Sequence, residues 1–176
     1  MELINKVFTM KKTIYIAFIL IISVVYNACT SSTSVDEPIG RKTFELLQKL
    51  DTISSADFND YFLSLEELRE FVKDTAVQDT FRNAMTTVSK AKHQERLLQA
   101  YEMLKESGEK FEIDWNKITF EDYVYQIRSD SGVEFHDGVV VFNQDAKKYL
   151  AKMISFEYKG EQRLFILSNF EPALKY

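Results

Sequence analysis

Hydrophobic residues recur at helical spacing through the first half of the chain. Between Arg41 and Leu50, apolar side chains return every three or four positions, which predicts a helix with one buried face. Ser64 is followed three residues later by Glu67, the pattern of a capping box, so a short helix is predicted from there to about Lys73. The segment 54–62 is predicted to be a junction whose aromatic residues close one end of the core.

A longer helical stretch is predicted from Thr75 to Ser107. Its apolar stripe is interrupted by the polar segment from Ser89 to Arg96, where the stretch is expected to bend or split. Gly108 is predicted to end the helix, because glycine readily adopts the left-handed conformation that follows a last helical turn.

Strand patterns replace helical ones after Trp115. Four segments are rich in β-branched and aromatic residues and are separated by short turns: 118–127, 133–142, 148–158 and 163–170. Short turns imply antiparallel pairing. The order of elements therefore predicts an α+β domain, with N-terminal helices packed on a curved antiparallel sheet of about four strands.

Two details of this sheet can also be predicted. Asp137-Gly138 interrupts the second strand segment and is either a tight hairpin turn or a bulge. In the third segment, alternation places a set of apolar residues on one face, namely Leu150, Ile154, Phe156 and Tyr158.

The first thirty residues have the pattern of an export signal. Met10, Lys11 and Lys12 precede an apolar run from Ile14 to Val25. This run has the length of a signal-peptide core and is shorter than the roughly 20 residues of a membrane-spanning helix. Met10 is a better start than Met1, because the two lysines then lie at the N-terminus.

The end of the apolar run, Ala28-Cys29, resembles a lipobox, the signal of bacterial lipoproteins. Tyr26 and Asn27 depart from the usual Leu and the usual Ala or Ser. The resemblance implies cleavage before Cys29 and attachment of fatty acids such as palmitate, which would anchor the chain to a membrane. The alternative is an ordinary signal peptide with an incidental cysteine. Cys29 is the only cysteine, so it forms no internal disulfide.

The predicted division of the chain follows from this signal. Residues 1–28 are a lipoprotein signal peptide, residues 29–38 a flexible tether, and residues 39–176 a single α+β domain. No acidic residue directly follows Cys29, which by resemblance to enterobacterial sorting implies the outer membrane of the cell envelope.

Charge narrows the classes of partner. Removing residues 1–28 takes away three lysines and one glutamate, which changes the net charge from −5 to −7. Nucleic-acid binders need a basic face, so no nucleic-acid partner is expected. Electrostatic docking on anionic lipid is disfavoured for the same reason, which leaves the lipid on Cys29 as the anchor.

The order of elements from Arg41 to Phe170 resembles the nuclear-transport-factor-2-like (cystatin-like) superfamily. The apolar clusters at 139–142, 153–158 and 164–167 contribute to this resemblance. It implies helices that close a cone-shaped sheet, whose mouth can hold a small molecule. Members that isomerise steroids use a carboxylate base with a tyrosine. Asp122, Tyr123 and Tyr125 include these residue types, but no matching motif carries the roles over.

Glu134 and His136 are the strongest candidates for chemistry. They are two residues apart in a predicted strand and so share a face, where they offer two metal ligands or a base with its orienting carboxylate. Asp122 is a further weak candidate. The alternative is a polar strand face in contact with solvent. His93 lies in a charged helical run and is expected on a solvated face.

No other pattern indicates catalysis. The chain has neither a Gly-x-Ser-x-Gly elbow nor a glycine-rich phosphate loop, so no catalytic residue, cofactor or metal is assigned. The sequence favours a non-enzymatic binding or interaction module, with an envelope protein or a small molecule as its partner. The alternative is an enzyme or ligand-binding protein with a pocket in the mouth of the sheet. Seven aromatic residues form either that pocket or the core: Tyr123, Tyr125, Phe135, Phe142, Phe156, Tyr158 and Phe165.

Overall fold

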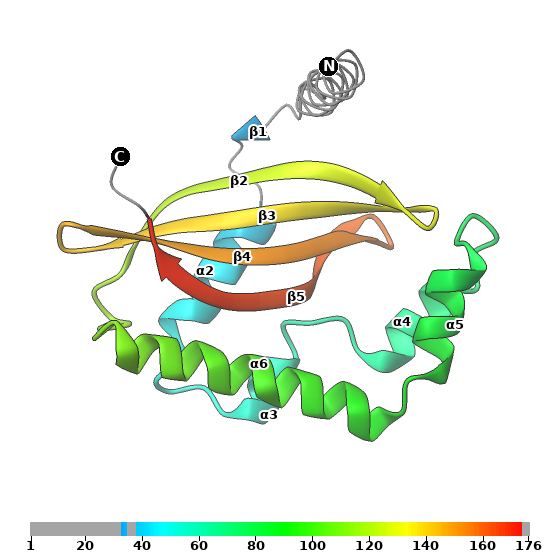
Figure 1. Ribbon diagram of the computed structural model, residues 1–176, viewed down its shortest axis with the longest axis horizontal. Coiled ribbons are helices and arrows are strands. Elements are labelled where there is room, and N and C mark those ends of the chain that lie inside the picture. Colours follow the sequence, from blue (N-terminus) through cyan, green and yellow to red (C-terminus); the bar gives the residue numbers. More distant parts are fainter. Residues whose placement is uncertain (1–32, 35–37, 174–176) are drawn as a thin grey trace, which may run out of the picture. The chain divides into compact units, whose positions relative to one another are not determined.

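The computed structural model describes residues 33–34 and 38–173, and it confirms the predicted α+β class. Five helices precede four long antiparallel strands (Figure 1). The helices are α2 (Pro38–Gln48), α3 (Ser55–Asn59), α4 (Leu65–Phe71), α5 (Asp79–Thr87) and α6 (Lys90–Lys110). The strands are β1 (Thr33–Ser34), β2 (Thr119–Asp130), β3 (Val133–Gln144), β4 (Lys147–Tyr158) and β5 (Glu161–Pro172).

Serine hydroxyls cap three of the helices. The predicted capping box of α4 is confirmed: Ser64 Oγ accepts from the Glu67 amide at 3.2 Å, and a Glu67 carboxylate oxygen accepts from the Ser64 amide at 2.8 Å. Ser54 and Ser89 cap α3 and α6 through the same kind of bond. Each hydroxyl satisfies an amide that has no partner within its own helix.

The long helical stretch was predicted to bend or split at the polar segment 89–96. It splits, at the start of that segment. Val88 takes an extended conformation after α5, and Ser89 then starts α6. The predicted stop at Gly108 is wrong, because α6 continues to Lys110. A Cβ at position 108 would lie 2.5 Å from Cζ2 of Trp115, so glycine is needed there for the close approach of the indole.

The four long strands form a meander, and the short β1 pairs beside β2, so that the order in the sheet is β1-β2-β3-β4-β5. The prediction of a turn or bulge at Asp137-Gly138 is wrong: both residues continue β3, paired with Gln126 and Tyr125 of β2. The turn predicted before residue 133 is confirmed: the chain reverses at Ser131–Gly132, where the φ angles are positive, 54° and 75°. Two residues with positive φ make the tight turn that suits the twist of a hairpin.

Two hydrophobic clusters hold the domain, and they cover opposite faces of the sheet. Val140 and Phe142 of β3 belong to one cluster, whereas Val133 and Phe135 belong to the other. β3 pairs without a bulge of its own between positions 135 and 142, so side chains alternate regularly along it. Phe135 and Phe142 are seven positions apart and therefore point to opposite sides.

Each cluster is closed by different helices. The first cluster includes residues of α2, α3 and α6, and the second includes residues of α4 and α5. In Figure 1, α6 runs along the β5 side of the sheet, while α4 and α5 lie together at one end of it. The predicted set in β4 shares one face by alternation. Its last three members, Ile154, Phe156 and Tyr158, join the second cluster, while buried Tyr149, Ala151 and Met153 face the first.

Part of the predicted tether belongs to the sheet. Thr33 and Ser34 pair with Tyr125 and Val124 of β2, and α2 begins at Pro38, one residue before the predicted domain boundary. Edge pairing ties these residues to the domain. The signal peptide, Cys29 and the rest of the tether lie outside the described residues. Within the described part of the chain, no helix is long and apolar enough to cross a membrane.

Candidate functional site

An apolar pocket of about 250 Å³ lies between the helices and the edge strand β5. α6 provides one wall and β5 the opposite wall, and single residues of the neighbouring helices and loops complete the lining. The lining residues are Phe62, Leu68, Met85, Val88, His93, Arg96, Leu97, Ala100, Met103, Phe165, Ile166, Leu167 and Ser168.

The helical wall follows from the spacing of residues along α6. His93, Arg96, Leu97 and Ala100 are three or four positions apart, so they lie on one face of the helix. Leu97 at the centre of this face is buried, whereas Arg96 is exposed. The break at Val88 and Ser89 allows Met85 and Val88, at the end of α5, to line the same space.

The strand wall depends on irregular pairing in β5. The register shifts between Ile154 and Ser155 of β4, which leaves Phe165 as an extra residue of β5 between two paired neighbours. A second shift leaves an extra residue after Leu167. Bulges redirect side chains that would otherwise alternate. Four consecutive residues, 165–168, therefore line the pocket, which a regular strand would not allow.

His93 is the functional candidate that sequence reasoning missed. It is half-buried in the pocket wall, so the expectation of a solvated face is wrong for this residue. Its Nε2 atom is buried and has no hydrogen-bond partner. The apolar positions four and seven residues on, at Leu97 and Ala100, were the available signal, but the charged neighbours of His93 obscured it.

Burial lowers the pKa of His93 below its ordinary value, and the positive charge of Arg96 lowers it further. Two weaker influences oppose them: the carboxylate of Glu66 on α4 and a hydrogen bond with the backbone of Leu63. At neutral pH the imidazole is therefore uncharged.

The pocket thus offers three polar side chains in an otherwise apolar lining: the His93 imidazole, the Arg96 guanidinium and the Ser168 hydroxyl. Apolar walls with a few polar groups are typical of sites that bind small molecules. Met103 and Ile166 keep 44% and 41% of their surface exposed, which gives the pocket an apolar rim.

The structure places the residues predicted from sequence elsewhere. Glu134 and His136 lie on the same face of β3, as expected, but neither lines the pocket. Asp122 pairs with Val141, whose side chain points to the opposite face from His136, so the fold does not bring Asp122 together with this pair. The Asp122 carboxylate accepts a hydrogen bond from the Tyr123 amide at 2.8 Å.

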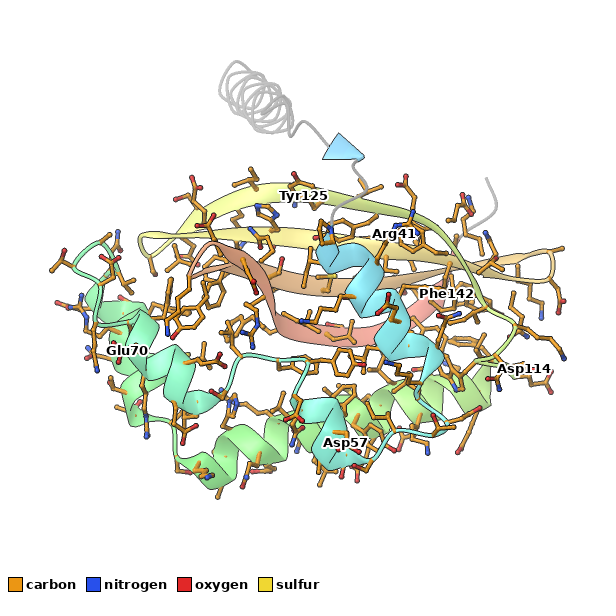
Figure 2. All side chains as sticks on the ribbon, turned by 180° about the vertical axis from the view of Figure 1, so that it is seen from behind. Arg41, Asp57, Glu70, Asp114, Tyr125 and Phe142 are labelled. Carbon is orange, nitrogen blue, oxygen red and sulfur yellow. The ribbon has the colours of Figure 1, made fainter. Side chains whose placement is uncertain are left out.

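His136 ends a row of stacked rings on β2 and β3. Its ring lies 4.4 Å from that of Tyr125, at an interplanar angle of 9°, and Tyr125 stacks at 5.5 Å on Tyr123. Gln162 of β5 approaches His136 Nε2 at 3.4 Å. Tyr125 lies on β2, away from α3 with its labelled residue Asp57 (Figure 2), whereas the pocket is built on the edge strand β5.

Most of the seven aromatic candidates pack into the core rather than line a pocket. Tyr123 and Phe142 belong to the first cluster, and Phe135, Phe156 and Tyr158 to the second. Phe165 lines the pocket. Within the described residues, no group of three or more His, Cys, Asp or Glu side chains is arranged to hold a metal ion.

Comparison with known proteins adds no family to this geometry. The resemblance to the nuclear-transport-factor-2-like superfamily stays a prediction. The described residues establish an α+β fold, in which helices precede an antiparallel meander. No protein-family model, no curated protein and no solved structure matches this chain.

Proposed function

We propose that this chain is the precursor of a bacterial lipoprotein, and that its domain is a non-enzymatic binding module for a small apolar molecule. Lipid on Cys29 holds the module at a membrane of the cell envelope. The binding role rests on one observation, the apolar pocket of about 250 Å³ between α6 and β5. Protein interiors are normally close-packed, and empty apolar space costs stability that a bound apolar ligand recovers.

The size of the pocket limits the ligand. Pockets for drug-sized molecules measure roughly 300 to 1,000 Å³, so a cavity of about 250 Å³ takes something smaller. A methylene group displaces about as much volume as a water molecule, roughly 30 Å³. The pocket therefore accommodates an aliphatic chain of about eight carbons.

A series of alkanols tests this role. The protein for the test is the unit Ser32–Tyr176, which is compact by itself and contains both hydrophobic clusters. Affinity should rise about fourfold for each added methylene, since burying one contributes about 0.8 kcal/mol, and should level off near octanol. Titration calorimetry with butanol, hexanol, octanol and decanol measures the series. An affinity that does not depend on chain length argues against the pocket as the site.

Two variants of α6 separate the pocket from the rest of the surface. Ala100→Phe adds an aromatic ring to the pocket wall and should abolish alkanol binding. Leu98→Phe makes a comparable addition at an exposed position of the same helix that does not line the pocket, and should bind like the unaltered protein. Equal binding by both variants would mean that the ligand lies elsewhere.

The anchor has its own experiment. Cells that express the full chain should incorporate a labelled fatty acid into it, and Cys29→Ser should remove the label, because the thiol is the acyl acceptor. Ser31→Ala, two residues further on, is the matched control and should keep the label. Continued labelling of the Cys29→Ser chain would contradict the lipoprotein proposal and leave the binding role untouched.

A further inference from the structure

A second hollow of different character adjoins the apolar pocket. The two hollows share Met85, Val88 and Arg96. The second hollow measures about 480 Å³ and is otherwise lined by Ala84, Thr87, Ser89 and Lys92. Arg96 therefore borders both the apolar pocket and the more polar hollow at the start of α6.

This polar surface is positive. Arg96 forms no ion pair with any residue in the described part of the chain, whereas neighbouring Lys92 is paired with Glu95 at 2.9 Å. The first turn of α6 contains no acidic residue. Because the amide groups at the start of a helix carry partial positive charge, the N-terminus of this 21-residue helix adds to the field of Arg96.

We propose that the ligand is a single-chain amphiphile with a carboxylate head, whose aliphatic chain fills the apolar pocket while its head lies against Arg96. The placement of the chain rests on the proposed function; the choice of head rests on the charge around the second hollow. Arginine binds carboxylates through two parallel hydrogen bonds, which suits a head with one negative charge. Since Lys92 already has its partner, the hollow presents one uncompensated side-chain cation.

His93 is the polar neighbour of Arg96 in the apolar pocket. It precedes the arginine by three positions on the same helical face. An anion beside Arg96 would offset the positive charge that acts on the imidazole. Carboxylate binding should therefore raise the pKa of His93 and be accompanied by proton uptake below pH 6.5, with Glu66 on α4 as the other charged group acting on His93.

The test compares three probes of equal chain length: decanoate, decanol and decyltrimethylammonium. Each is titrated as a monomer into the unit Ser32–Tyr176 at pH 8, where decanoate is ionised. Decanoate should bind at least tenfold more tightly than decanol, and decyltrimethylammonium more weakly than either. Arg96→Gln should weaken decanoate binding about five- to tenfold and leave decanol binding unchanged, because only the carboxylate uses the guanidinium.

Lys90→Gln is the matched control. It removes one positive charge from the same helix at an exposed position that lines neither hollow, so decanoate affinity should stay within about twofold. If decanol binds as tightly as decanoate, and Arg96→Gln changes neither, the inference about the head is wrong while the apolar site stands. If Ala100→Phe also leaves all three probes unaffected, the proposed function is wrong as well.

Discussion

The ring of Tyr123 lies directly against the backbone of Gly138, so closely that a Cβ atom at position 138 would be 2.5 Å from Cε2 of the tyrosine. Gly40 of α2 meets the same side chain from the helical layer, where a Cβ would be 2.4 Å from Cγ. Tyr123 is fully buried between them. Because both positions are glycine, the backbones of α2 and β3 can both lie against the ring of Tyr123.

This arrangement predicts that Gly138→Ala and Gly40→Ala both destabilise the domain, by about 1 to 3 kcal/mol each, through overpacking against Tyr123. For Gly40→Ala, the sign of the change in unfolding free energy is informative. Without a clash, alanine would stabilise the helix by about 1 kcal/mol relative to glycine. Urea unfolding measures the change. Lys42→Ala, at an exposed position of α2, should shift stability by less than about 0.5 kcal/mol.

A double-mutant cycle identifies the cause. In a Tyr123→Leu background, Gly40→Ala should cost less than in the unaltered protein, because the atoms that the new Cβ would meet belong to the ring. If the cost of Gly40→Ala is the same in both backgrounds, the clash with Tyr123 is not its source.

The pKa of His93 predicts how the stability of the domain depends on pH. Burial and Arg96 lower this pKa in the folded state from the ordinary value of 6.5. As pH falls below about 6.5, the unfolded chain takes up the proton first, so stability is lost between that pH and the lower folded pKa. NMR titration should show a His93 midpoint below 6.5, and His93→Gln should reduce the acid-induced loss. A midpoint above 6.5 would contradict the burial of this ring.

The guanidinium of Arg82, on α5, holds the loop between α4 and α5. Its Nε donates to the Val72 carbonyl at 2.9 Å, and its Nη2 donates to the carbonyls of Asp74 and Val77 at 3.1 and 2.6 Å. Lysine keeps the charge but cannot reach these three acceptors in the same geometry. Arg82→Lys should therefore cost about 1 to 3 kcal/mol, measured by urea unfolding.

Hydrogen exchange locates that effect. The amides of residues 72–78 should lose protection in Arg82→Lys, because the bonds that hold this loop are lost. Arg69→Lys is the control, since Arg69 makes a single bond of this kind, to the Val88 carbonyl. If Arg82→Lys and Arg69→Lys reduce the unfolding free energy by similar amounts, the three bonds of Arg82 stabilise the domain no more than a single bond does.

His136→Ala tests whether the ligand binds at the pair Glu134 and His136, the candidates from the sequence, or in the apolar pocket. The substitution removes a ring that stacks on Tyr125, which should cost about 1 kcal/mol. Alkanol and decanoate affinities should be unchanged, because His136 does not line the pocket. Loss of binding in His136→Ala, with binding retained in Ala100→Phe, would instead favour the alternative of a site that uses Glu134 and His136.

Local features of the sequence predicted the helices-first order and the four long strands, but α3 (Ser55–Asn59) was predicted as part of a junction and β1 as part of the tether. The capping box at Ser64 and Glu67 was found correctly, because it depends on atoms three residues apart. The short turns predicted between strand segments were found for a similar reason. Two of them lie at Ser131–Gly132 and Lys159–Gly160, where the positive φ angles are a requirement of the turn itself. The α+β class then followed from short connections between strands.

The errors occurred where a residue is explained by a partner distant in sequence. Gly108 and Gly138 look like breakers, yet each continues its element because Trp115 or Tyr123 packs against it. The pocket was missed for the same reason. His93 lies among charged residues in the sequence, and only the approach of β5 turns its helical face into a wall.

By itself, the sequence determined the longer helices, the four long strands and the turns at Ser131–Gly132 and Lys159–Gly160. It also contains the export signal from which Cys29 is predicted to carry lipid. Tertiary structure decided that two clusters cover opposite faces of one sheet, that bulges in β5 bring Phe165 into the pocket, and that Asp122 and His136 are separated. The physical reason is the separation along the chain over which each interaction acts. Backbone propensities and caps act within a few residues, whereas packing and burial depend on contacts between residues far apart in the chain.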